Sequence, residues 1–270
     1  MFDFSVLMSL YIKENPFFLK QALESIYNSE LLPTEVVMVL DGEITQEQQN
    51  VLNEYPQLKI IPLEENKGLS NALNIGLKHC KYDLVARMDT DDICHSMRFK
   101  KQVEFLSQNM NVDVVGTFSY KIDENGKVIG NLIAPIGHDE IYKRIWTCPF
   151  IHPTVMFRRD SILSIGGYNP NSGPRQDDYE LWFRCAENRL RFDNIAEPLF
   201  YYRFFSDSIK RNNIKVGWYR MKVGINGCRK LNLSPIAYLG VCVPLFRSLL
   251  PYPLNVWFNN LMIKINPRHN

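Results

Sequence analysis

The sequence has no closely paired cysteines, no repeats and no export signal. Its six cysteines are scattered over 270 residues, and none has the spacing of a zinc ligand. They stand among apolar neighbours, as small buried side chains do, which fits a reducing cytoplasm. Asp3 stands where a secretory signal would carry positive charge. No segment repeats at a fixed period, so we expect a globular cytoplasmic protein rather than a solenoid.

Several familiar motifs and long hydrophobic runs are also missing. A Gly-rich dinucleotide fingerprint, a Walker-type phosphate loop and a Gly-x-Ser-x-Gly elbow are all absent, which excludes a Rossmann dehydrogenase and an esterase. The uncharged stretches 231–246 and 248–263 hold 16 residues each, fewer than the ~20 that a membrane-spanning helix needs. Prolines and asparagines interrupt both stretches, so we expect no transmembrane pass.

Acidic residues are missing after Asp207, whereas ten lysines and arginines follow it. A positively charged segment suits binding either to nucleic acid or to an anionic membrane surface. No helix-turn-helix, zinc-finger or RNP signature occurs, so we expect no nucleic-acid partner. Aromatic residues such as Tyr238, Tyr252 and Trp257 stand among the basic ones and favour attachment to a membrane interface. The alternative is a helical subdomain packed on the core, and the two can hold together.

Short apolar runs alternate with amphipathic segments in the first half, which predicts an α/β fold with a mostly parallel sheet. Later segments favour mixed or antiparallel strands, including a hairpin over 120–133 that turns at Asn125-Gly126. Helices are expected after Asn212. The predicted strands are 5–10, 35–40, 58–61, 84–88, 112–118, 154–157, 191–195 and 199–205, and the predicted helices are 16–29, 45–55, 69–77, 97–108 and 178–187.

Three carboxylates, those of Asp89, Asp91 and Asp92, directly follow the predicted strand 84–88. Ligands bind at the carboxyl ends of strands in open α/β sheets. Because neighbouring carboxylates repel one another, a hard divalent ion such as Mn²⁺ or Mg²⁺ is the expected compensator. The alternative is a capped loop in which Asp92 or Ser96 begins the next helix.

A second acidic group opens the predicted helix at Asp177 and Asp178. By itself it is typical of simple helix capping. Together, the two groups could hold a metal-diphosphate and supply a carboxylate that removes a proton from a hydroxyl. Nucleotide-sugar chemistry needs both functions.

Ordered motifs over residues 4–208 resemble the inverting glycosyltransferases of family 2, which adopt a GT-A fold. They include the DXD motif that begins at Asp89. The matching segments are 4–11, 37–42, 66–74, 86–92, 152–154, 166–168 and 178–182. The resemblance implies a catalytic domain over 1–208 and a helical extension over 209–270, on the membrane or acceptor side.

The resemblance also implies roles for the donor-binding residues. Asp41 would hydrogen-bond the uracil of a UDP-sugar, with Ser9 and Tyr11 lining the base and ribose pocket. Asp89 would contact the nucleoside or sugar, and Asp91 would ligate the metal that bridges the diphosphate.

Further residues are expected at the chemical step. Asp178 would be the general base. The sequence has Asp177 where the family usually has Glu, which leaves the role of Asp177 open. Lys67 or Arg203 would help to offset charge on the departing diphosphate.

Other prominent residues carry two interpretations each. His152 is either an acceptor or diphosphate contact or a hydrogen-bonded structural residue, and Tyr179 and Trp182 either stack on a sugar or belong to the core. Arg87 and Arg98 either pair with the acidic triplet or cap a solvated face.

The resemblance implies transfer of galactose or glucose from a UDP-hexose to GlcNAc- or GalNAc-diphospho-undecaprenol, with a β-1,3 linkage, in O-antigen or capsule assembly. The protein would then lie peripherally on the inner face of the bacterial inner membrane. The alternative is a non-catalytic nucleotide-sugar-binding or scaffold protein on the same fold. The sequence carries no signal for an oligomeric state.

Overall fold

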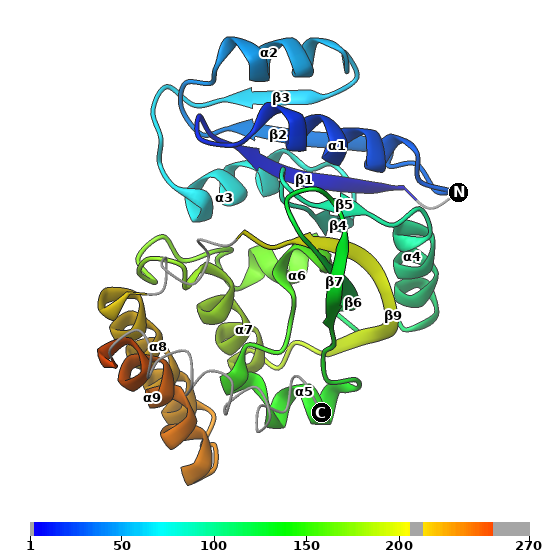
Figure 1. The fold of residues 1–270 in the computed structure, drawn as a ribbon. Helices are drawn as coiled ribbons and strands as arrows, with labels where there is room; N and C mark the ends of the chain where they lie inside the picture. Colours follow the sequence, from blue (N-terminus) through cyan, green and yellow to red (C-terminus); the bar gives the residue numbers. More distant parts are fainter. Residues whose placement is uncertain (1–2, 206–212, 251–270) are drawn as a thin grey trace.

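The computed structural model describes residues 3–205 and 213–250, and within them nine strands form one mixed sheet (Figure 1). The strand order is β3-β2-β1-β4-β8-β6-β9-β5, with β7 beside β6. The strands are β1 (Phe4–Leu10), β2 (Glu35–Leu40), β3 (Lys59–Pro62), β4 (Leu84–Arg87), β5 (Ile93–Cys94), β6 (Val114–Ile122), β7 (Val128–Leu132), β8 (Met156–Arg158) and β9 (Phe192–Arg203).

Strands β1 to β4 are parallel, and the sheet becomes mixed where β8 pairs antiparallel with β4. This change matches the shift from β-α units to hairpins in the sequence, so the predicted α/β class is confirmed. Because β1, β2 and β4 are parallel neighbours, their carboxyl ends lie along one edge of the sheet. The loops that follow these strands therefore share that edge.

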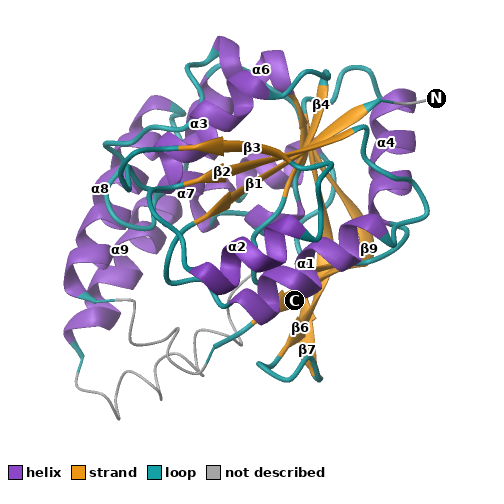
Figure 2. Ribbon diagram, turned by 90° about the horizontal axis from the view of Figure 1, so that it is seen from above, coloured by secondary structure: helices purple, strands orange, loops and turns teal. Residues whose placement is uncertain are grey.

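Helices cover both faces of the sheet (Figure 2). One face packs on α1, α2 and α4, through side chains such as Leu23 and Phe99. The other packs on α3 and α7, through side chains such as Leu73 and Trp182. The helices are α1 (Pro16–Tyr27), α2 (Gln46–Asn53), α3 (Leu69–His79), α4 (Arg98–Gln108), α5 (His138–Lys143), α6 (Arg159–Ser164), α7 (Asp177–Glu187), α8 (Ile214–Lys230) and α9 (Pro235–Leu249), with 3-10 turns η1 (Ile145–Thr147) and η2 (His152–Thr154).

Local signals located most of these elements. At the start of α2, the Thr45 hydroxyl accepts from the Gln48 amide and the Gln48 side chain accepts from the Thr45 amide, which together form a capping box. One prediction was wrong: 191–195 and 199–205 are not separate strands but parts of β9. The pairing of β9 with β6 shifts between Ile195 and Pro198. Proline cannot donate to the ladder, so the sequence signal breaks where the strand continues.

The predicted helices after Asn212 are confirmed as α8 and α9, which lie side by side, with α8 packed on α7 and α9 packed on η1 (Figure 1). Tyr252 and Trp257, and the part of the stretch 248–263 that follows Leu250, lie outside the described residues. In the described part of the chain, none of the helices has both the length and the apolar character needed to cross a membrane.

Candidate functional site

The carboxyl ends of β1 and β2 place three of the predicted nucleotide contacts on one edge. Ser9 lies on β1 opposite Val39 of β2, Tyr11 follows the end of β1, and Asp41 follows the end of β2. The side chain of Tyr11 is 36% exposed, whereas Asp41 is buried. The sheet therefore brings these residues together, and their contacts with a nucleotide stay predictions.

Asp41 fixes the loop that leads into α3. Its Oδ1 accepts from the Lys67 amide at 2.7 Å and its Oδ2 accepts from the Gly68 amide at 3.0 Å. The ammonium group of Lys67 lies 4.0 Å from Glu65 and is largely exposed. A carboxylate has about four acceptor positions, so Asp41 keeps capacity for a further donor. The proposed contact of Lys67 with a diphosphate is untested.

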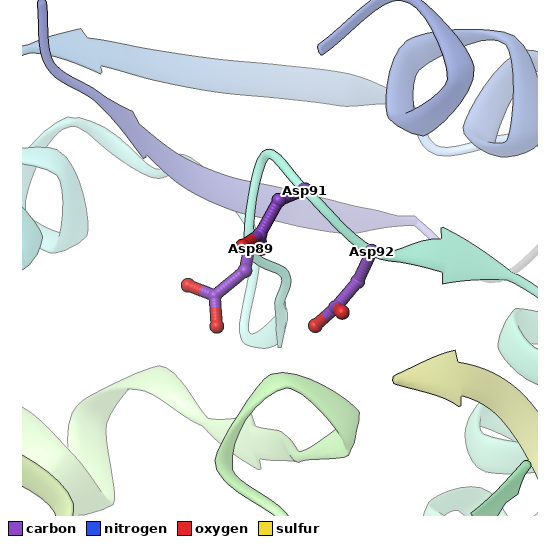
Figure 3. Close-up of side chains that lie close together, drawn as sticks. All are labelled: Asp89, Asp91 and Asp92. Atoms are coloured by element: carbon purple, nitrogen blue, oxygen red, sulfur yellow. The ribbon is translucent and has the colours of Figure 1, made fainter. Parts of the chain in front are cut away.

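The three carboxylates predicted at the end of β4 lie close together on the chain between β4 and β5 (Figure 3). One oxygen from each of Asp89, Asp91 and Asp92 lies within 4.8 Å of the others. This spacing suits several oxygen ligands around one small divalent cation.

Arg87 and Arg98 are both buried beneath this triplet. Arg87 pairs with Asp89, since its Nη1 donates to Asp89 Oδ2 at 2.8 Å and its Nη2 donates to Asp89 Oδ1. Pairing with the triplet is thus confirmed for Arg87. Arg98 neither pairs with the triplet nor caps a solvated face, because its Nη2 donates to the Arg87 carbonyl at 2.8 Å and its Nε donates to Gln102. With both oxygens of Asp89 held by Arg87, Asp91 and Asp92 are left as the better cation ligands.

The charges of Asp91 and Asp92 are poorly compensated. Burial and the Asp89 carboxylate raise the pKa of Asp91 from 3.8 to about 6. Burial, with Asp91 and Asp89 adding to it, raises the pKa of Asp92 well above its ordinary value. Asp92 Oδ2 is buried and accepts no hydrogen bond from the residues that the structure describes. An unsatisfied buried oxygen beside two further carboxylates fits a divalent metal such as Mn²⁺ or Mg²⁺.

Arg203 is held by oxygens of the protein itself, and its role at the diphosphate stays a prediction. It is only 3% exposed, and its Nε donates to the Asp91 carbonyl at 2.7 Å while Nη2 donates to Gln21 at 2.8 Å. Its Nη1 donates to the carbonyls of Asp123 and Glu124. Its backbone amide donates to Asp92 Oδ1 at 2.7 Å. Arg203 therefore holds the acidic loop against the β6–β7 turn and α1.

We expect Mn²⁺ to raise the melting temperature more at pH 7.5 than at pH 5.5. The folded pKa of Asp91 lies above its ordinary value, so without metal the folded state binds more protons between pH 3.8 and about 6. The free energy of unfolding thus falls as pH rises through this window, and a cation replaces the lost protons. Thermal denaturation with and without Mn²⁺ measures the shift. Asp91→Asn should shrink it at pH 7.5, and equal wild-type shifts at both pH values would contradict the metal site.

The second acidic group lies at the first turn of α7, as predicted. Asp178 Oδ1 accepts from the Tyr179 amide at 2.7 Å, and Oδ2 accepts from the Cys148 thiol at 3.3 Å. Asp177 accepts from the Ser70 hydroxyl of α3. Burial raises the pKa of Asp177, and the hydrogen bond from Ser70 opposes the rise. Asp177 thus joins α7 to α3, while Asp178 keeps a half-exposed carboxylate.

Arg87, His152 and Tyr168 interact with one another near the acidic groups. His152 Nε2 lies 2.9 Å from the Tyr168 hydroxyl, which confirms His152 as a hydrogen-bonded residue. Burial, together with the Arg87 cation, holds the pKa of His152 well below its ordinary value, so the imidazole is neutral.

Tyr168 lies within electrostatic range of Arg87 and of the two aspartates of α7. Burial raises the pKa of Tyr168, with Arg87 opposing the rise and the Asp178 and Asp177 carboxylates adding to it. Arg87 binds Asp89 directly. Arg87 and Tyr168 therefore link the two aspartate groups electrostatically, although Asp89 and Asp178 are 89 residues apart in sequence.

Some contacts of the site have no sequence signal. Cys148 follows η1 with a φ of 61°, a conformation uncommon for a residue other than glycine. Ser70 is an ordinary residue on an amphipathic helix. Tyr179 and Trp182 are fully buried, which confirms the core interpretation for both.

Sequence comparisons give a consistent family. The family description "Glycosyl transferase family 2" matches residues 5–166. The "UDP-Gal:alpha-D-GlcNAc-diphosphoundecaprenol beta-1,3-galactosyltransferase" of Escherichia coli is 36% identical over 212 residues, which is 77% of this chain and 76% of that protein. The "Amylovoran biosynthesis glycosyltransferase AmsE" of Erwinia amylovora is 37% identical over 232 residues, or 82% and 86% of the two chains.

Solved structures show the same fold at low identity. Staphylococcus aureus TarS 1–349 in complex with UDP-GlcNAc gives a TM-score of 0.69 at 16% identity, covering 99% of this chain and 78% of that one. The mannosyltransferase PcManGT from Pyrobaculum calidifontis, in complex with GDP-Man and Mn²⁺, gives 0.62 at 16% identity, with 98% and 81% covered. The predicted GT-A architecture is confirmed.

Proposed function

The chain belongs to glycosyl transferase family 2, and we propose that it transfers a hexose, galactose or glucose, from a UDP-sugar to a lipid-linked sugar during assembly of a bacterial surface polysaccharide. The acceptor we propose is GlcNAc- or GalNAc-diphospho-undecaprenol, with a β-1,3 linkage formed. The name of the Escherichia coli relative supports this choice. The observation that carries the proposal is that Arg87, which binds Asp89, and Asp178 both lie within electrostatic range of Tyr168.

The residues proposed to bind the donor are distinct from the one proposed to act on the acceptor. Ser9, Tyr11 and Asp41 would bind the nucleoside at the edge of β1 and β2. Asp89, fixed by Arg87, would orient the donor sugar, while Asp91 would hold Mn²⁺ or Mg²⁺. When bound, the metal supplies positive charge that offsets the charge growing on the departing diphosphate.

Asp178 is the proposed general base. The acceptor hydroxyl attacks the anomeric carbon from the face opposite UDP, and Asp178 accepts the hydroxyl proton as the new bond forms. The Tyr179 amide and the Cys148 thiol bind its two oxygens and fix the carboxylate in one orientation. Because the hydroxyl displaces UDP in one step, the configuration at the anomeric carbon is inverted.

The test is incubation with UDP-galactose, UDP-glucose and their N-acetyl analogues, together with synthetic GlcNAc- or GalNAc-diphospho-lipid, in Mn²⁺ or in EDTA. We expect one UDP-hexose to be consumed with Mn²⁺ and not with EDTA. The product linkage, determined by NMR, then gives the stereochemistry. Binding of UDP-sugar without any product would favour a non-catalytic nucleotide-sugar-binding protein instead.

We further propose that the extension over 209–270 attaches the catalytic domain, 1–208, to the inner face of the inner membrane. In the described part of the extension, α9 presents Ile236, Leu239 and Phe246 to solvent, with exposed fractions of 69%, 72% and 63%. Their spacing of three and seven residues places them along one face of the helix. The described residues 213–250 hold six lysines and arginines and no acidic residue, which suits an anionic lipid surface.

We expect salt-sensitive co-sedimentation with anionic liposomes and little with neutral ones. Leu239→Glu should reduce the bound fraction severalfold, since it places a charge in the apolar stripe. Met110→Glu is the matched control, because Met110 is 71% exposed and lies after α4, away from α9. Equal loss in both variants, or equal recovery of wild-type and Leu239→Glu protein with the liposomes, would count against this surface.

A further inference from the structure

One face of α8 is held tightly against its neighbours and carries an arginine. Gly217, Arg220 and Gly224 stand three and four residues apart and so share this face. A Cβ at Gly217 would lie 3.0 Å from the Cα of Leu245 in α9, and a Cβ at Gly224 would lie 2.8 Å from the hydroxyl of Tyr179 in α7. Arg220 therefore projects at the junction of α7, α8 and α9.

Arg220 lies beside the proposed base. Its guanidinium carbon is 4.2 Å from the centre of the Tyr179 ring, and the amide of Tyr179 donates to Asp178. Its Nη2 lies 3.5 Å from the carbonyl of Thr147, and the next residue, Cys148, donates to Asp178 from its thiol. Arg220 thus contacts Tyr179 and the residue next to Cys148, and Tyr179 and Cys148 are the two residues that bind the carboxylate of Asp178.

The guanidinium of Arg220 has donors left for a ligand. It offers five N–H groups; among residues that the structure describes it donates to the Thr147 carbonyl and hydrogen-bonds the side chain of Cys148, and none of their carboxylates lies within 4.0 Å of it. The side chain is half-buried rather than fully enclosed. A partly desolvated arginine with free donors is well suited to a phosphate group.

A second arginine stands on the facing helix. Arg247 lies in the segment of α9, residues 244–248, that packs on Gly217. Burial lowers the pKa of Arg247, and the charge of Arg220 lowers it further. The two cations are therefore close enough to repel one another, and an anion between them would relieve the repulsion.

We propose that Arg220 and Arg247 bind the diphosphate of the lipid-linked acceptor. This inference rests on the proposed function. The donor diphosphate is assigned to Asp91, at the end of β4, whereas the arginine pair lies on the α7–α8 side of Asp178. A sugar held at Asp178 would then have its diphosphate at the arginines and its lipid directed along α9, whose apolar stripe includes Leu239 and Phe246.

The test compares two acceptors that differ only in the diphosphate: GlcNAc-diphospho-lipid and a neutral alkyl GlcNAc glycoside. For Arg220→Gln we expect the KM of the diphosphate acceptor to rise about 10- to 100-fold, with a much smaller loss on the neutral glycoside and no change in the KM of the UDP-sugar. Arg247→Gln should act in the same direction. Arg229→Gln, an exposed arginine on the same helix, is the charge-matched control and should leave both acceptors unaffected.

Each other outcome overturns the inference. Equal losses on both acceptors would mean that Arg220 positions Asp178 or supports the fold, and a raised KM for the UDP-sugar would mean that it binds the donor diphosphate. Calorimetric titration in EDTA with the detergent-dispersed diphosphate acceptor gives a readout without turnover. Wild-type binding that Arg220→Gln weakens at least tenfold supports the site, and equal binding by both proteins rejects it. A wild-type protein that binds this acceptor but transfers no sugar would refute the proposed function alone.

Discussion

Replacing Asp178 by asparagine is expected to lower kcat by about 10²- to 10⁴-fold, the usual contribution of a general base. The amide keeps the shape of the side chain and can still accept from the Tyr179 amide, but it cannot accept the proton of the attacking hydroxyl. Binding of UDP, measured by calorimetry with Mn²⁺ present, should be unchanged because the residues proposed to bind the nucleoside lie at the ends of β1 and β2. The change in kcat without a change in UDP affinity is the signature of a group acting in the chemical step.

Two companion variants make this result specific. Asp160→Asn alters a carboxylate that is 80% exposed on α6 and should retain full activity. Asp177→Asn disturbs the hydrogen bond from Ser70 and is expected to lower the melting temperature more than it lowers kcat. A normal rate in Asp178→Asn would refute the assignment, and a loss in Asp177→Asn as large as that expected for Asp178→Asn would move the role of base to Asp177.

Replacing Arg203 by methionine is expected to lower the free energy of unfolding by about 3–5 kcal/mol, the usual cost of removing one member of a buried charged network. The change leaves the carbonyls of Asp91, Asp123 and Glu124 without their donor and removes a cation that interacts with Asp92 and Asp91. For a chain of this size the loss corresponds to a fall of roughly 10 °C in melting temperature. The stabilisation by Mn²⁺ should also decrease, because the loop that carries Asp91 is no longer fixed.

The variant Arg203→Lys distinguishes the contribution of the positive charge to stability from that of the planar guanidinium. A lysine keeps the cation but has no planar fork to bind several oxygens at once, so we expect it to recover only part of the stability. If Arg203→Met instead melted like the wild type while transfer was lost, the arginine would act on the substrate, contrary to its hydrogen bonds in this structure.

Local patterns were enough to place most strands and helices. The run over 35–40 became β2 at those bounds, and the capping box at Thr45 begins α2. Alternation, helical spacing and capping act between residues that are close in sequence, so they can be recognised without a partner. The continuity of β9 was missed because Pro198 resembles a strand end, whereas the pairing of this segment with β6 depends on a strand that is far away in sequence.

The sequence by itself determined the α/β class, the family resemblance and the position of three aspartates after a buried strand. The tertiary structure alone decided which partner each charged side chain has. Arg203 is bound to the acidic loop, Asp89 is held by Arg87, and Arg220 of a distant helix lies beside Asp178. A charged side chain reveals its role only when its neighbours are known, because burial and the nearest opposite charge set its ionisation and its free donors, and those neighbours come from segments that folding brings together.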